Sequence, residues 1–60
     1  MSGLIKIEIE TALDKCKSIL EIEEIRQKYN NGFTNEDDIK EFNHLIANAR
    51  TRVLVEISLR

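Results

Sequence analysis

Proline is absent from this 60-residue chain, and its only glycines are Gly3 and Gly32. Because proline and glycine are the usual interruptions of regular structure, long helices are the default expectation for such a chain. The strongest break lies at Asn30-Asn31-Gly32. This tripeptide predicts a helix end that is followed by a residue in the left-handed conformation. We therefore expect one helical segment before residue 30 and another after residue 32.

The first of these segments contains a second helix start. Ser18-Ile19-Leu20-Glu21 matches the capping-box pattern, in which a serine and a glutamate three residues later satisfy the first amides of a helix. A single straight helix over residues 4–30 would bury two opposed apolar stripes. The first stripe comprises Ile5, Ile9, Ala12, Leu13 and Cys16, and the second comprises Ile22, Ile25 and Tyr29. Two helices, over residues 4–17 and 19–30, would each bury one stripe.

The third helix is expected over residues 35–57. Thr34 and Asp37 resemble a capping box, and Glu36, Asp37 and Asp38 would lie in the first turn, where the helix dipole favours negative charge. Apolar residues then follow in steps of three and four. They are Ile39, Phe42, Ile46, Ala49, Val53 and Ile57. Leu54 and Val55 fall off this stripe, Leu45 lies at its edge, and all three are candidates to face a partner or a second layer. The fold class is therefore a small all-α, three-helix domain that spans residues 1–60.

An α+β alternative stays open at this point. Residues 4–10 alternate between apolar and polar side chains as a strand would, and residues 53–57 are rich in β-branched side chains. Terminal strands flanking two helices would resemble ribbon-helix-helix repressors, which are dimers. In that fold Glu8 and Glu10 would face DNA, where carboxylates are unfavourable because DNA itself is an anion.

A chain of this size buries little surface and often needs a staple or a partner. Cys16 is the only cysteine and His44 the only histidine, so neither an internal disulfide nor a zinc site is expected, and no cofactor motif is present. We expect stability to come from helix packing, from a homodimer or from a larger partner. The free thiol and the lack of an export signal or of a long apolar run favour a cytoplasmic protein without a membrane segment.

Charge is unevenly distributed along the chain. Residues 1–48 carry 6 basic and 10 acidic side chains, hence −4, whereas residues 49–60 carry 3 and 1, hence +2. A net charge of −2 excludes a nucleic-acid binder that relies on bulk positive charge. Arg50 and Arg52 are candidates for phosphate contact. Acidic runs at residues 21–24 and 36–41 are typical of solvated helix faces or of a surface that recognises a basic partner.

Catalytic chemistry is not expected from this sequence. His44 has no nucleophile nearby along the chain and is predicted to lie on the polar side of the third helix. Cys16 shares an apolar stripe and is predicted to be buried, although Lys15 and Lys17 could favour a reactive thiolate if it were exposed. No glycine-rich phosphate loop, nucleophile elbow or metal-ligand spacing is present. The chain is therefore predicted not to be an enzyme.

Several short motifs follow one another in a recognisable order. Cys16-Lys17-Ser18-Ile19 is followed by an acidic and apolar helix that contains Ile22, Glu23, Ile25 and Tyr29. Phe33-Thr34-Asn35, Phe42 and Ala47-Asn48-Ala49-Arg50 come next. In this order the chain resembles the Hha/YmoA family of haemolysin-expression-modulating, nucleoid-associated proteins. The likeness spans roughly residues 10–54. Asn48 stands where the family has an acidic residue, and the C-terminal proline-to-tryptophan segment of the family is missing.

The resemblance implies a cytoplasmic, nucleoid-located adaptor that binds the nucleoid-structuring protein H-NS and modulates gene silencing, with DNA engaged mainly through that partner. It points to Glu21, Glu23, Glu24 and Asn48 as partner-binding residues, and Arg50 and Arg52 are secondary candidates for phosphate contact. Two other functions stay open. One is a phage- or plasmid-encoded helical inhibitor of a host protein that acts through an acidic surface, and the other is the dimeric strand-helix-helix repressor.

Overall fold

The computed structural model describes residues 1–59 and consists of three helices in that range. They are α1 (Gly3–Asp14), α2 (Ile19–Tyr29) and α3 (Glu36–Ser58). The all-α prediction is confirmed, and the terminal-strand alternative is wrong because residues 4–10 belong to α1 and residues 53–57 to α3. The strand-helix-helix repressor requires a strand where α1 lies. Alternation misled here because Ile5 and Ile9 are four residues apart, a spacing that equally suits a helix.

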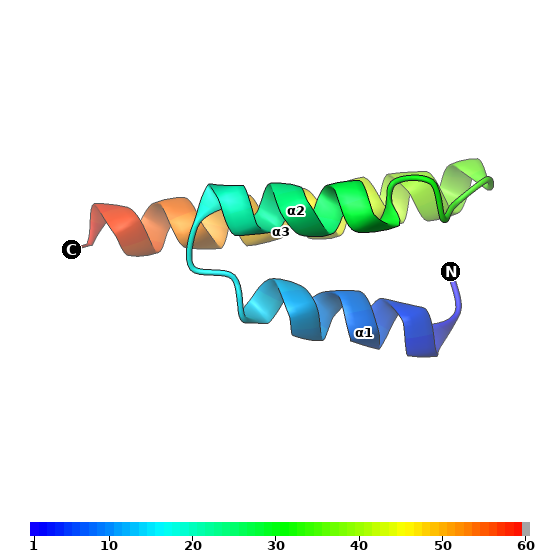
Figure 1. Cartoon of the computed structure of the whole chain (residues 1–60), viewed down its shortest axis with the longest axis horizontal. Helices are drawn as coiled ribbons and strands as arrows, with labels where there is room; N and C mark the ends of the chain where they lie inside the picture. Colours follow the sequence, from blue (N-terminus) through cyan, green and yellow to red (C-terminus); the bar gives the residue numbers. More distant parts are fainter. Residues whose placement is uncertain (60) are drawn as a thin grey trace.

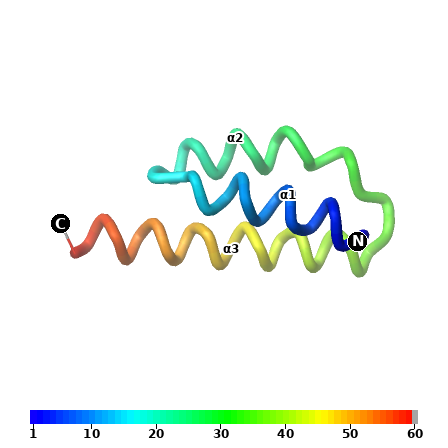
Figure 2. Tube along the Cα trace, turned by 90° about the horizontal axis from the view of Figure 1, so that it is seen from below, coloured from blue at the N-terminus to red at the C-terminus, as the bar shows by residue number. Residues whose placement is uncertain are grey.

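The helices run side by side in an up-down-up order, so that α1 and α3 point the same way and α2 runs against both (Figures 1 and 2). Each helix packs against the other two. The molecule measures 38 × 17 × 16 Å, and α3 supplies the long dimension. None of the helices in residues 1–59 combines the length and the apolar character that crossing a bilayer requires.

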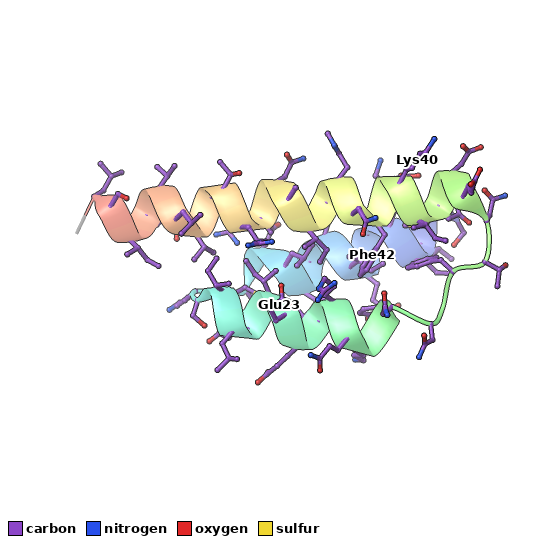
Figure 3. The ribbon with its side chains drawn as sticks, turned by 90° about the horizontal axis from the view of Figure 1, so that it is seen from above. Glu23, Lys40 and Phe42 are labelled. Atoms are coloured by element: carbon purple, nitrogen blue, oxygen red, sulfur yellow. The ribbon has the colours of Figure 1, made fainter. Side chains whose placement is uncertain are left out.

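The core lies along the line where the three helices meet. It consists of Ile9, Leu13, Cys16, Ile22, Phe42, Ile46, Ala49 and Val53. Near the connection between α2 and α3, the Phe42 ring lies 5.2 Å from the Phe33 ring and 6.5 Å from the Tyr29 ring, measured between centroids. Figure 3 shows Phe42 between α3 and α2, whereas Lys40, two residues earlier on α3, points away from the other helices.

The predicted stripes are right in their middle and wrong at their ends. Ile5, Ile39 and Ile57 were each expected in the core, but they are 42%, 39% and 47% exposed. Each lies near one end of its helix, and Ile57 also lies beyond Arg52, which contacts the end of α1. Periodicity identifies the face of a helix that turns inward, but it does not reveal how far the neighbours reach.

The first connection ends α1 earlier than predicted, at Asp14 instead of residue 17. The amides of Lys15 and Cys16 donate to carbonyls of the last turn, at 3.3 and 3.0 Å, and close it. The predicted Ser18 cap of α2 is present, but the return bond of the capping box goes to Lys17 instead of Ser18. The Ser18 hydroxyl accepts a hydrogen bond from the Glu21 amide at 3.3 Å, and the Glu21 carboxylate accepts one from the Lys17 amide at 2.7 Å.

The second connection differs from prediction in two ways. The cap of α3 is Asn35, whose side-chain oxygen accepts from the Asp37 amide at 2.8 Å, so the helix begins one residue later than a Thr34 cap implies. No residue of the described chain has a positive φ, so the expected left-handed residue after α2 is absent. Gly32 serves another purpose. Its amide donates to the Tyr29 carbonyl at 2.9 Å, and an added Cβ would lie only 3.2 Å from that oxygen.

The length of α3 leaves its C-terminal end outside the bundle. Its 23 residues compare with 12 in α1 and 11 in α2. Because every residue of a helix adds the same rise, α3 is about twice as long as either neighbour. The connection between α1 and α2 lies at the level of Arg52, and the helix continues past it into solvent (Figure 1). We call residues 54–59 the projecting end.

Candidate protein-binding surfaces

Three of the predicted partner-binding residues lie on α2. Glu21 is exposed, but its carboxylate is engaged by the amide of Lys17. Glu23 forms an ion pair with Arg26 at 2.9 Å and keeps about a third of its side chain exposed. It lies on the side of α2 that faces α3 in Figure 3. Glu24 is exposed. The acidic run is therefore partly neutralised by groups on its own helix and the turn before it.

Asn48, the fourth predicted residue, lies in a groove between α1 and α3. The groove has a volume of about 260 Å³. Helix α1 contributes Glu10, Leu13 and Asp14 to it. Helix α3 contributes Leu45, Asn48, Ala49 and Arg52. Its floor is thus apolar and its α1 rim is acidic. None of the three α2 glutamates borders the groove, so the single partner face predicted from sequence is divided between two places.

Arg50 and Arg52 were predicted to act alike, but the structure gives them different surroundings. Two residues apart on a helix are about 200° apart around its axis. Arg50 is exposed. The guanidinium of Arg52 turns toward α1, where it donates to the Leu13 carbonyl at 2.7 Å and to the Cys16 carbonyl at 3.4 Å. It also pairs with Glu56 at 3.3 Å. Arg52 therefore links α3 to the end of α1, and its guanidinium is engaged by two carbonyls and a carboxylate.

Cys16 is buried, as predicted, with 3% of its surface exposed. Its thiol donates to the Ala12 carbonyl at 3.5 Å. Burial raises the pKa of the thiol, and the carboxylate of Glu21 adds to this effect, while Arg52 opposes it. Burial disfavours the alternative of a thiolate activated by the flanking lysines. His44 is exposed on α3, as predicted.

Polar contacts join α1 to the other helices at its N-terminal half. The amino group of Met1 pairs with Asp38, and Lys6 pairs with Glu41 at 3.2 Å. The Tyr29 hydroxyl donates to Glu8 at 3.0 Å. The hydrogen bond to Asp38 raises the pKa of the Met1 amino group. The hydrogen bond to Glu8 raises the pKa of the Tyr29 phenol. Sequence reasoning missed these contacts because their partners lie far apart along the chain, in different helices.

Large apolar side chains are unusually prominent on the surface. Nine in the described chain are exposed, namely Leu4, Ile5, Ile7, Leu20, Ile39, Leu54, Val55, Ile57 and Leu59. Four of the nine belong to the projecting end. Leu54 and Val55, which sequence analysis put off the core stripe, are about half exposed. Apolar side chains that gather into a patch mark a site of interaction, whereas single exposed ones are ordinary on a protein surface.

Within residues 1–59, no three side chains of the metal-binding types come together in a way that could hold an ion. Comparison with protein-family models, with curated proteins and with solved structures gave no match to this chain. The functional assignment therefore depends on the surfaces described above and on the sequence resemblance.

Proposed function

We propose that this chain is a small protein-interaction module and not an enzyme, and that its partner is a nucleoid-structuring protein of the H-NS type whose silencing of genes it modulates. The observation that carries the interaction role is the set of nine large apolar side chains that the described part of so small a domain exposes. The identity of the partner comes from the resemblance of residues 10–54 to the Hha/YmoA family.

Charge supports a basic partner. The chain up to Asn48 carries a net charge of −4, and both α2 and the rim of the groove are acidic. Complementary charge of this kind increases the association rate and the specificity more than it increases affinity. Two alternative contact faces follow, one with Glu23 and Glu24 on α2 and one with Asn48 in the groove.

DNA is engaged mainly through the partner in this proposal. Arg52 is held by two carbonyls and by Glu56, so it has little freedom to bind phosphate. Arg50 is exposed, but one arginine on a chain with net charge −2 supplies little of the electrostatic attraction that nucleic-acid binding requires. Nucleoid location follows from the partner.

The test is an NMR titration of isotopically labelled protein with the N-terminal dimerisation domain of H-NS. We expect saturable shifts that weaken as salt is added, either at residues 21–24 or at residues 48–52. Because these residues lie in two separate places, the shifted set identifies the contact face. The absence of shifts at a few hundred micromolar, about the weak limit of a specific contact, would overturn the assignment of the partner.

A pair of variants separates specific contact from general charge. Glu24→Gln and Glu36→Gln remove the same charge from two exposed positions, one on α2 and one in the first turn of α3. If α2 is the contact face, Glu24→Gln weakens binding several-fold and Glu36→Gln leaves it nearly unchanged. Equal weakening by both variants would show that only net charge matters.

A further inference from the structure

The asparagines of this chain differ in whether their side chains can react with their own backbone. The carboxamide carbon of an asparagine lies within reach of the amide nitrogen of the next residue, and attack by that nitrogen closes a five-membered ring. This reaction is one reason why asparagine is a thermolabile residue. It is fastest where glycine follows, because glycine has no Cβ to hinder the approach or to restrict the backbone. The asparagines are Asn30, Asn31, Asn35, Asn43 and Asn48.

The fold protects three of these asparagines. Asn43 and Asn48 lie inside α3, where the amide of the next residue is hydrogen-bonded to a carbonyl one turn earlier. Asn35 caps α3, and its side-chain oxygen accepts from the Asp37 amide at 2.8 Å. Either the attacking nitrogen or the carboxamide is therefore engaged by α3 at each of the three positions.

Asn31 is the asparagine that glycine follows. Asn31 and Gly32 are both exposed in the connection between α2 and α3, at one end of the molecule (Figure 1). The turn has its own reason for glycine, since a Cβ at residue 32 would lie 3.2 Å from the Tyr29 carbonyl oxygen. Asn30 also lies beyond the last residue of α2, but the residue after it is Asn31, whose Cβ hinders the corresponding attack. The two neighbouring asparagines thus differ mainly in the residue that follows.

We propose that Asn31 is a site of spontaneous deamidation whose rate is set by the folded turn. The Gly32 amide nitrogen, after losing its proton to hydroxide, attacks the carboxamide carbon of Asn31. The bond from that carbon to the side-chain nitrogen breaks, and the nitrogen leaves as ammonia. Water then adds to one of the two carbonyls of the succinimide and opens the ring. The product carries aspartate or isoaspartate at residue 31, and water is the only reagent consumed.

A hydrogen bond within the turn opposes this reaction. The Gly32 amide donates to the Tyr29 carbonyl at 2.9 Å, and its nitrogen cannot attack while that proton is engaged. Tyr29 is itself held, because its hydroxyl donates to Glu8 at 3.0 Å and its ring meets Phe42 edge-on. The ends of helices open locally at a lower free energy than the whole domain. The reaction is therefore expected to proceed through opening of the last turn of α2, and not through unfolding of the bundle.

Deamidation places a carboxylate where the fold does not favour one. Residue 31 follows the C-cap of α2, the end of a helix at which the dipole disfavours negative charge. The acidic first turn of α3, residues 36–38, lies just beyond. Isoaspartate also lengthens the backbone two residues before Phe33, whose ring packs against Phe42. The net charge falls by one unit from −2, so ion exchange separates the modified chain from the unmodified one.

Peptide mapping by mass spectrometry, after incubation of the folded protein in mildly alkaline buffer, tests for the site. We expect conversion at residue 31 before conversion at any other asparagine, with isoaspartate among the products. Asn31→Gln should abolish this conversion, because the longer side chain must close a larger ring, whereas the matched variant Asn30→Gln should leave it unchanged. An intact Asn31 while another asparagine converts, or equal rates at residues 30 and 31, overturns the proposal.

The dependence of the rate on urea tests the role of the turn. Opening of one helical turn exposes little surface, so the rate should stay nearly constant in urea concentrations below the unfolding transition. The unfolded chain should convert about two- to tenfold faster, the factor that one hydrogen bond of ordinary strength provides. A rate that follows the unfolded fraction, or one that is the same in the folded and unfolded chains, overturns the role assigned to the turn. The H-NS titration has no bearing on either measurement, because no partner is present.

Discussion

Two parts of α3 both carry large apolar side chains, but their surroundings differ. Residues 36–53 carry Phe42, Ile46, Ala49 and Val53, all of which are buried. Residues 54–59 carry four large aliphatic side chains, all of which are exposed. The comparison of Ile46 and Ile57, at 4% and 47% exposure on the same helix, shows that burial is set by the reach of α1 and α2. Composition alone makes both parts look like core.

The largest expected difference comes from removing the same atoms in each part. Ile46→Ala leaves a cavity among three helices and should lower the free energy of unfolding by about 2–5 kcal/mol, much of what a small domain has. The side chain of Ile57 is already half exposed. Ile57→Ala should therefore cost under about 1 kcal/mol in dilute protein. Urea unfolding followed by circular dichroism measures both, and equal losses would remove the distinction.

Arg52 marks the boundary between the two parts, and its neighbour Arg50 is the natural control. Arg52→Met removes the hydrogen bonds that the guanidinium donates to the Leu13 and Cys16 carbonyls. We expect a loss of about 1–2 kcal/mol, discounted for partial exposure. Arg50→Met should change the free energy of unfolding by less than about 0.5 kcal/mol. Stability unaffected by either substitution would show that the Arg52 link is unimportant.

Two serines compare a helix cap inside the bundle with a hydroxyl on the projecting end. Ser18 caps α2. Ser18→Ala should cost about 1 kcal/mol. The Ser58 hydroxyl donates to the Leu54 carbonyl of its own helix at 2.9 Å. Ser58→Ala should be within about 0.5 kcal/mol of neutral. Thermal unfolding of the two variants side by side measures the difference, which a larger loss from Ser58→Ala would contradict.

The smallest effect is a dependence of stability on alkaline pH, and it arises only in the packed part. The pKa of the Met1 amino group is raised above 8.0 by Asp38. A group whose pKa is higher in the folded state contributes its full stability below the unfolded value, and that contribution is lost as the pH rises through the folded value. Burial raises the pKa of Cys16 above 9.0. Its thiol must stay protonated in the folded state, so it adds a second loss at higher pH.

The free energy of unfolding should therefore decline gradually from pH 8 upward. Asp38→Asn should remove the earlier part of the decline, near pH 8, and leave the later part that Cys16 causes. Urea unfolding at a series of pH values, for the unmodified chain and for Asp38→Asn, measures the two parts. Stability that rises with pH in this range would contradict the assigned contacts.

Sequence patterns predicted the helices of this fold better than they predicted which of their side chains are covered by neighbouring helices. The Ser18 cap separated α1 from α2 correctly because a capping box uses neighbouring residues only. The cap of α3 was misplaced by one residue, because Thr34 and Asn35 can both serve as caps and local sequence does not decide between them. The exposure of Ile57 was missed because the length of a neighbouring helix is not encoded near residue 57.

The sequence identified individual surface residues, but it did not show which of them lie together in the folded chain. Glu24 and Asn48 were both identified, but the separation of α2 from the groove depends on how the helices pack. The role of Arg52 was missed for the same reason, because its carbonyl partners at Leu13 and Cys16 are 39 and 36 residues away in the sequence. Long-range contacts of this kind have no local signature.

Amide hydrogen exchange along α3 tests most directly whether its two parts differ. In dilute protein we predict strong protection of residues 42–53 and rapid exchange of residues 54–58. Protection of residues 54–58 that equals that of residues 42–53 would contradict this account.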